Sequence, residues 1–141
     1  MTARWLLVAL TLVACATSTG HGPAPDPAGP ATWAQQMRIV KANLARVQRA
    51  LATSPPGDLV AVANDARAAA AILRQGYTTA EQPSVPGYAR YAREAESWLL
   101  QVALEARSAH GELAAERFAA GAGQHCTRCH DAVERAGKAG G

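Results

Sequence analysis

Apolar residues recur at intervals of three and four in four separate stretches of the sequence, and this spacing restricts the fold more than any other feature. Residues three and four positions apart lie on the same side of an α-helix, so each stretch predicts a helix with one apolar face. The stretches cover residues 33–51, 59–77, 88–106 and 115–133. Because the connections between them are short, we expect neighbouring helices to run antiparallel. The sequence therefore predicts an all-α fold, an up-down-up-down four-helix bundle.

Alanine accounts for 34 of the 141 residues, whereas aromatic residues make up only 5%. Alanine is the residue that most favours the α-helix, and β-sheets prefer branched and aromatic side chains, so the composition also indicates helices. Side chains this small bury little apolar area per residue. The composition therefore leaves space for another apolar body inside the bundle.

The first residues have the pattern of an export signal. Arg4 supplies a positive charge, and the apolar run from Trp5 to Val13 is too short to span a membrane as a helix. The run ends in Leu12-Val13-Ala14-Cys15, which resembles the lipobox of bacterial lipoproteins, where cleavage precedes the cysteine and the thiol receives lipid. We therefore expect a signal peptide at residues 1–14 and a lipid anchor on Cys15. Two alternatives are an ordinary secretory signal with an incidental Cys15 and an apolar N-terminal helix of a cytosolic protein.

Prolines and glycines crowd the next segment, residues 15–31, which shows no periodicity. Such a segment is extended and would hold a folded domain away from the membrane as a tether. The bundle domain is then expected at residues 32–137, with residues 138–141 as a disordered tail. Within it, glycines predict two helix ends, at Gly76 for the second helix and at Gly137 for the fourth.

The segment Cys126-Thr127-Arg128-Cys129-His130 is a C-x-x-C-H motif, the attachment motif for c-type haem. On a helix the two cysteines share one face and can each form a thioether along one edge of the porphyrin. His130 then lies under the iron as its proximal axial ligand. Attachment of this kind occurs outside the cytoplasm, which agrees with the export signal. We therefore predict one haem c, with its iron, in each chain.

Three other uses of the two cysteines remain open. A thioredoxin-like redox pair would need a βαβ context, and the pattern contains only helices. A structural zinc site would need four ligands, for which His110 or His125 would have to be recruited. In an oxidising compartment Cys126 and Cys129 could also form a simple disulfide. Without such a role, His125 is expected to face solvent.

A four-helix bundle with C-x-x-C-H near the end of its last helix resembles the class II cytochromes c, the family of cytochrome c prime and its low-spin relatives. The resemblance covers residues 32–137 and is strongest over residues 118–135, where an aromatic residue and small residues precede the motif. Family members usually have an aromatic and a basic residue three and four positions after the histidine, and this chain has Val133 and Glu134 there. The resemblance implies a bundle that encloses one covalently bound haem.

Met37 on the first helix is the candidate sixth ligand of the iron. The low-spin members carry a methionine on this helix, and Met37-Arg38 with Asn43 is similar to their pattern. A methionine on an apolar face is otherwise core filler. His110 is a competing distal ligand, and an open, five-coordinate iron is a third arrangement. Three aromatic side chains are expected to pack against the macrocycle or simply within the bundle: Tyr91, Trp98 and Phe118.

Two classes of haem function and one class without haem follow from these features. The first is a one-electron carrier with a His/Met-ligated haem, anchored to a bacterial membrane through Cys15 and facing the periplasm. The second is a five-coordinate protein that binds nitric oxide or carbon monoxide. The third is a structural lipoprotein with a Cys126–Cys129 disulfide. The sequence contains no paired carboxylates, nucleophile–base set or phosphate loop, so we do not expect an enzyme.

The expected partners of a carrier are the lipid bilayer and redox proteins of the membrane or periplasm. Removal of residues 1–14 would delete Arg4 and leave 13 basic against 11 acidic residues, and this net charge of +2 is too small to indicate a nucleic acid. Alanines at positions 66 and 68–71 give the second helix a small-residue face. Family members often dimerise through the first two helices, so the resemblance implies a homodimer through this face.

Overall fold

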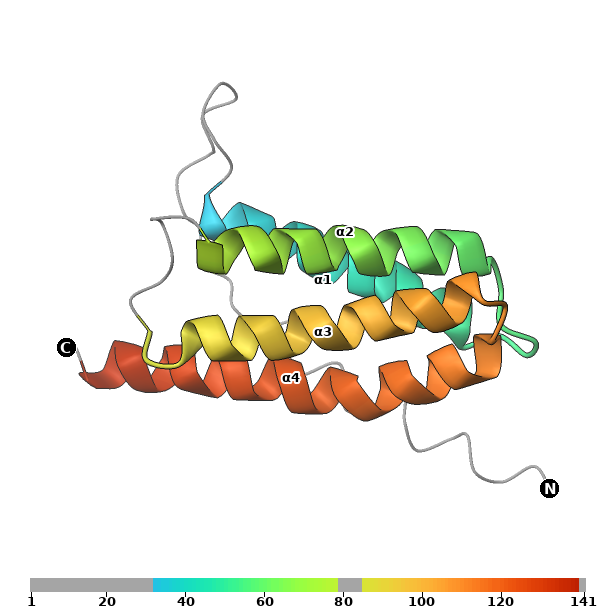
Figure 1. Cartoon of the computed structure of the whole chain (residues 1–141). Helices are drawn as coiled ribbons and strands as arrows, with labels where there is room; N and C mark the ends of the chain where they lie inside the picture. Colours follow the sequence, from blue (N-terminus) through green and yellow to red (C-terminus); the bar gives the residue numbers. More distant parts are fainter. Residues whose placement is uncertain (1–31, 79–84, 140–141) are drawn as a thin grey trace. The chain divides into compact units, whose positions relative to one another are not determined.

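The computed structural model describes residues 32–78 and 85–139, with side chains described as far as residue 135. Over these residues the chain forms four α-helices and no strand. In chain order they are α1 (Trp33–Leu51), α2 (Leu59–Thr78), α3 (Tyr88–Arg107) and α4 (Gly111–Ala139) (Figure 1). The expected signal peptide, the lipid anchor at Cys15 and the tether lie outside the described residues.

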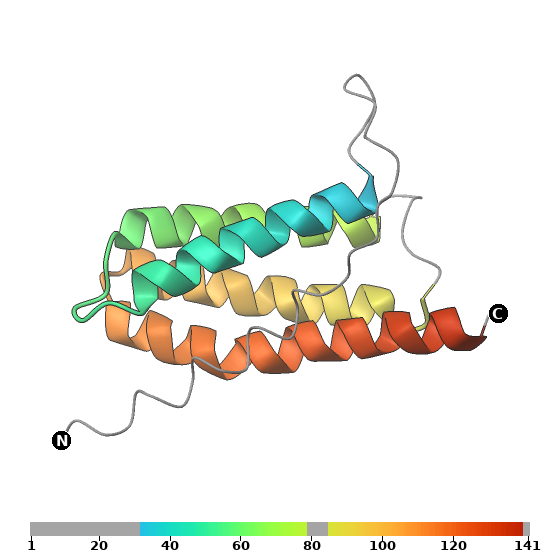
Figure 2. The ribbon, with the colours of Figure 1, turned by 180° about the vertical axis from the view of Figure 1, so that it is seen from behind.

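The four helices pack as a bundle, which confirms the predicted all-α, four-helix architecture. Helix α1 packs on α2, α2 on α3 and α3 on α4, whereas the contact between α1 and α4 is much the smallest of the four. In Figure 2, α1 inclines away from α4 toward its own first turns. The core is built from alanine and valine with few larger side chains, which are Leu51, Trp98, Leu99 and Phe118. The bundle is therefore closed tightly on three sides and loosely between α1 and α4.

An ion pair joins each pair of consecutive helices. The nitrogen–oxygen distances are 2.8 Å for Arg46–Asp65, 3.5 Å for Arg74–Glu96 and 3.7 Å for Arg128–Glu94. Glu96 is only 8% exposed, and the Tyr77 hydroxyl donates a second hydrogen bond to it. A buried carboxylate in a helix seam was not expected from the sequence, and these two partners are what compensate its charge.

Local signals account for several helix ends. Thr32 caps α1, because its side chain accepts from the Gln35 N–H while the Gln35 side chain accepts from the Thr32 N–H. Gly87 precedes α3 with φ of 79°, a left-handed conformation that glycine adopts without strain. Ala109 in the turn before α4 has φ of 60°. These caps and turns lie where the sequence predicts the breaks between helices.

Two predicted helix ends are wrong. Helix α2 continues through Gly76 to Thr78, and α4 continues past Gly137, so that Lys138 and Ala139 are helical rather than part of the tail. Gly76 is buried, and a Cβ there would lie 2.8 Å from the Tyr88 hydroxyl and against the ring of Trp33. The glycine therefore permits the close approach of α1 and α3 to α2 instead of ending the helix.

Candidate cofactor site

Helix α4 carries all three residues of the predicted attachment motif. Cys126 and Cys129 are half-buried and His130 is exposed. They lie three and four residues apart on one continuous helix, so the two sulfurs and the imidazole share a side of α4, as the spacing predicts. No disulfide joins the two cysteines in this structure. Burial raises the pKa of the Cys129 thiol above its ordinary value.

Burial changes along the inward face of α4. Ala114 is 0% exposed and Phe118 is 6% exposed, but His125, Cys126 and Cys129 are all half-buried before Ala132 is covered again. Helix α1 shows the matching change, because Val47 is 0% exposed whereas the side chains of its first two turns, Trp33 to Met37, are half-buried or exposed. The loosely covered parts of these two helices are therefore the first turns of α1 and the Cys126–His130 segment of α4.

Tyr88, in the first turn of α3, contacts both α1 and α2. Its ring makes an edge-to-face contact with Trp33 of α1, with centroids 5.1 Å apart, and its hydroxyl lies over Gly76 of α2. Burial and the neighbouring Cys129 sulfur of α4 raise the pKa of this hydroxyl. We call this region, defined by Trp33, Gly76, Tyr88 and the Cys126–His130 segment, the cysteine end of the bundle.

The Tyr88 side chain is 2% exposed, and its hydroxyl has no hydrogen-bond partner. Buried polar atoms are nearly always hydrogen-bonded, and leaving one unsatisfied costs about 1–3 kcal/mol. His125 Nδ1, next to Cys126, is likewise buried without a partner. Two buried polar atoms from different helices therefore lack partners beside the two cysteines.

Trp98 of α3 lies in a notch on α4 that Gly121 creates. A Cβ at Gly121 would fall on the indole ring, and the indole N–H donates to the Arg117 carbonyl over 3.0 Å. Phe118 lies on the ring with a centroid distance of 5.4 Å, and His125 stacks on it, also at 5.4 Å. The expectation that His125 faces solvent is wrong, because the helix pairing brings it onto Trp98.

This stack gives a pH dependence that His125 should control. Burial is the largest cause that lowers the pKa of His125 below 6.5, against a smaller opposing effect of Glu94. The unfolded chain then takes up the proton first, so the stability that neutral His125 contributes is present above about pH 6.5 and is lost as the pH falls below it. We expect the free energy of unfolding in urea to fall from about pH 7.5 to about pH 5.5, and to fall less in His125→Phe. An equal fall in both proteins would contradict this assignment.

The two candidate distal ligands lie in different places. Met37 is half-buried, one turn after Trp33, and packs against the hydrophobic core. His110 is exposed in the turn between α3 and α4, with Nδ1 3.4 Å from a Glu105 carboxylate oxygen. It precedes α4, and at 1.5 Å per residue the helix carries the motif roughly 30 Å away. The position of His110 therefore speaks against it as a distal ligand, whereas Met37 stays a candidate.

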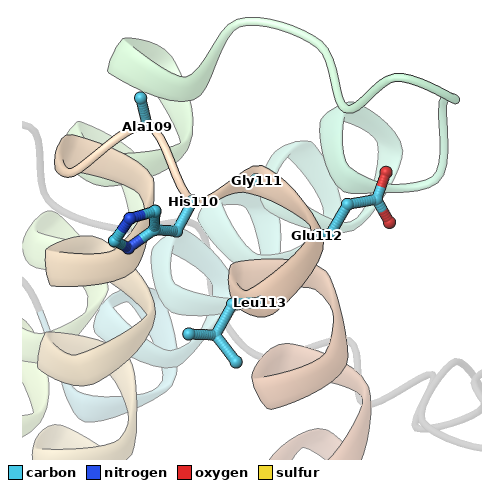
Figure 3. Close-up of a pocket in the computed structure, with 5 residues that line it drawn as sticks. All are labelled: Ala109, His110, Gly111, Glu112 and Leu113. Atoms are coloured by element: carbon cyan, nitrogen blue, oxygen red, sulfur yellow. The ribbon is translucent and has the colours of Figure 1, made fainter.

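Two pockets of the described chain lie away from the motif. One is at the corner between α3 and α4, where five consecutive residues line it and the side chains of His110 and Glu112 point to opposite sides (Figure 3). Another lies between α2 and the end of α3, beside the exposed Val60. Neither includes a residue of the Cys126–His130 segment. Within the part of the chain that the structure describes, no group of three or more His, Cys, Asp or Glu side chains could hold a metal ion without a further group.

Sequence reasoning missed several residues of the cysteine end. It placed Tyr88 only on a helix face, treated Gly76 as a helix end and gave His125 no partner. The signal that could have found Tyr88 is its place at the start of α3, which antiparallel pairing of α3 with α4 brings opposite the last turns of α4. No helix within residues 32–78 and 85–139 is long and apolar enough to cross a membrane. Comparison of the chain with protein-family models, curated proteins and solved structures found no match.

Proposed function

We propose that the domain is a c-type cytochrome that carries single electrons. Cys126 and Cys129 would hold the haem through thioethers, and His130 would bind its iron. The observation that carries the proposal is the change in burial along α4, which leaves the two thiols half-covered opposite the equally loose start of α1. An apolar ring bonded to both sulfurs would cover these side chains. The small residues of the bundle leave them partly exposed.

The donor set of this structure fits the group. Two thiols and one imidazole project from a single helix, and buried polar atoms without partners, the Tyr88 hydroxyl and His125 Nδ1, flank them. Zinc would need a fourth ligand. A ligand that enters between the helices, bonded to the two thiols and to His130, would explain the buried hydroxyl and the exposed imidazole better than a zinc ion would.

The antiparallel arrangement that this proposal includes is supported by paired contacts. Along α3 and α4, Trp98 contacts His125 and Glu94 pairs with Arg128, so positions advance along α4 as they decrease along α3. Between α1 and α2, Arg46 pairs with Asp65 while Trp33 contacts Gly76. Such contacts bring the start of α1 and the end of α4 to the same end of the bundle, where one flat ligand could touch both.

When bound, haem iron cycles between the ferric and ferrous states by one electron. The chain would contribute two axial ligands, His130 and Met37, and would exclude water with Trp33 and Tyr88. Methionine–histidine ligation raises the reduction potential relative to two histidines. A closed six-coordinate site suits electron transfer because neither face of the iron is vacant for other chemistry.

One observation favours the gas-binding alternative. Met37 packs against the hydrophobic core, as a methionine that only fills space would do. If its sulfur stays there, the iron keeps an open distal position in apolar surroundings and could bind carbon monoxide or nitric oxide. The choice between the two functions therefore depends on this one side chain.

The absorption spectrum of the chain, made in a host that attaches haem, tests the proposal. A red protein whose haem stays with the denatured chain is expected. The weak far-red sulfur-to-iron band of the ferric form would support the carrier, whereas a high-spin spectrum that shifts when carbon monoxide meets the ferrous form would support gas binding. A colourless protein would refute both and favour the disulfide-bonded structural protein.

Met37→Ala is the variant that isolates the sixth ligand. We expect the far-red band to disappear and the ferrous form to gain the ability to bind carbon monoxide, because the ligand is removed without changing the attachment residues. Leu44→Ala, which also shortens a half-buried side chain of α1, is the control and should keep the band. An unchanged ferric spectrum in Met37→Ala would show that its sulfur does not bind the iron.

We also propose that the domain is held at a bacterial membrane, facing the periplasm, by lipid on Cys15. The anchor would raise the concentration of the carrier near membrane redox partners. Mass spectrometry of the mature N-terminus tests this proposal: a diacylated Cys15 is expected, and an unmodified terminus would contradict it. Replacement of Cys15 by alanine should release the protein from the membrane fraction.

A further inference from the structure

Helices α2 and α3 expose charged side chains of one sign only. Their acidic residues are half-buried or buried, and each pairs with an arginine: Asp65, Glu94, Glu96 and Glu105. Their exposed charged residues are all arginines: Arg67, Arg74, Arg90, Arg93 and Arg107. The outer side of these two helices therefore carries positive charge, which the small net charge of the chain does not reveal.

Aliphatic side chains lie among these arginines. Val60 of α2 is 71% exposed and Leu104 of α3 is 62% exposed, the two largest values for large apolar residues in the described chain. Leu100 is 44% exposed, and its position four residues before Leu104 places both on one side of α3. Leaving aliphatic carbon in water is unfavourable. A partner of this surface would therefore cover aliphatic carbon as well as balance positive charge.

A hollow between α2 and the end of α3 brings both kinds of side chain together. Val60 and Arg67 of α2 and Arg107 of α3 line it, and none of its lining residues is acidic. No described acidic residue forms an ion pair with either arginine. Guanidinium groups bind phosphate oxygens through paired hydrogen bonds, so this hollow would attract phosphate. We use the name arginine face for five residues: Val60, Arg67, Leu100, Leu104 and Arg107.

The arginine face lies on the side of the bundle opposite the loosely closed seam. Consecutive helices pack on one another, so α2 and α3 form one side and α1 and α4 the other. Figure 1 shows the first side, with α1 behind α2, and Figure 2 shows the second. The described side chains of α4 include exposed acids, which an anionic surface would repel: Glu112, Glu116, Asp131 and Glu134. A negatively charged partner is therefore expected on the α2–α3 side, where it leaves the seam between α1 and α4 uncovered.

We propose that the arginine face rests on the surface of an anionic lipid bilayer, where its arginines bind lipid phosphates and its aliphatic side chains enter the headgroup layer. The inference rests on the proposed location at a bacterial membrane, but it needs neither the lipid on Cys15 nor bound haem. A bilayer supplies negative charge and apolar depth together across two helices. Salt screens such a contact, so it acts with the lipid anchor rather than in its place. The domain would then turn its α1–α4 side toward the periplasm.

Chemical labelling of arginines in the full chain, read by mass spectrometry, tests which face meets the bilayer. The chain is labelled with phenylglyoxal on vesicles of phosphatidylcholine and on vesicles that also contain phosphatidylglycerol. We expect the anionic vesicles to lower the labelling of Arg67 and Arg107 several-fold, because the bilayer covers them. Arg38 and Arg49, exposed on α1, are the controls and should be labelled equally on both kinds of vesicle. Equal labelling of Arg67 and Arg107 on both kinds, or an equal loss at all four arginines, would overturn the proposal.

The double variant Arg67→Gln, Arg107→Gln measures what the two charges contribute. The chain is made from Ala16 onward, without leader or lipid, and keeps all four described helices. Each arginine near an anionic surface strengthens binding about fivefold, so this variant should bind phosphatidylglycerol vesicles roughly twenty-five-fold more weakly at low salt. The matched control, Arg38→Gln, Arg49→Gln, removes the same charge from α1 and should weaken binding much less. Equal weakening by the two double variants would place the contact elsewhere and refute the arginine face.

Leu104→Ser tests the apolar part of the contact, with Leu113→Ser as the control because Leu113 of α4 is also exposed, at 41%. Only Leu104→Ser is expected to weaken vesicle binding, and equal effects would overturn the proposed insertion. A lipid-free chain that does not bind anionic vesicles at low salt would overturn the whole proposal and leave an acidic protein as the occupant of the arginine face. These results are separate from the proposed function, because an unmodified Cys15 would refute the anchor and a colourless chain the cytochrome without changing vesicle binding.

Discussion

We expect the double variant Cys126→Ser, Cys129→Ser to carry no covalent haem when it is made in a host that attaches haem to the unchanged chain. Serine keeps the size of each side chain, but its hydroxyl does not form the thioether. Each single variant should keep one bond, because the other half-buried thiol remains on the same face of α4. The measurement is the haem that stays with the chain after denaturation and solvent extraction. The band of the reduced haem in alkaline pyridine reports how many thioethers are present.

Thr127→Ser is the matched control for these variants. Thr127 lies between the two cysteines and is exposed, so this change alters the same turn of α4 without touching either sulfur. It should keep the full complement of covalent haem. Covalent haem in the double variant would show that the attachment residues are wrongly assigned. Loss of haem in Thr127→Ser as well would show that the turn, and not the thiols, is what the changes disturb.

The helices of this fold could be predicted because each depends on local sequence. Spacing of three and four alone gives α1 from Trp33 to Leu51, and the bounds of the others follow to within a few residues. The errors occur where a contact with a distant part of the sequence decides whether a helix ends or continues. Gly76 has the signal of a helix end, but α2 continues because Trp33 and Tyr88 pack against the bare backbone there. Nothing in the sequence near Gly76 reveals these neighbours.

The candidate site also contains residues that local sequence predicts and residues that it does not predict. The motif from Cys126 to His130 is contiguous, so spacing on one helix was enough to find it. Tyr88 and Trp33 come together over Gly76 only through the packing of α1, α2 and α3, which periodicity does not specify. His125 shows the difference most clearly, because it is adjacent to the motif and yet its contact is Trp98 of α3, distant in sequence. Local chemistry could be predicted, whereas the surroundings that tune it could not.

Gly121→Ala is expected to be the most destabilising single-methyl change in the bundle. The added Cβ would fall on the Trp98 indole, which cannot move away without losing its hydrogen bond to Arg117 and its stack on His125. Overpacking of this kind costs about 1–3 kcal/mol, and the higher helix propensity of alanine returns about 1 kcal/mol. Because the collision involves a rigid ring and the helix backbone, we expect a net loss of about 2 kcal/mol in the free energy of unfolding.

Gly123→Ala, two residues along the same helix, should have the opposite sign. No atom lies within 4 Å of a Cβ at this position, and Gly123 is exposed in the interior of α4. Alanine there keeps its favourable propensity without a collision, so stability should rise by about 1 kcal/mol. Urea unfolding of the two variants beside the unchanged protein measures the difference. If both glycines gave the same sign, the notch under Trp98 would not be a tightly packed contact between α3 and α4.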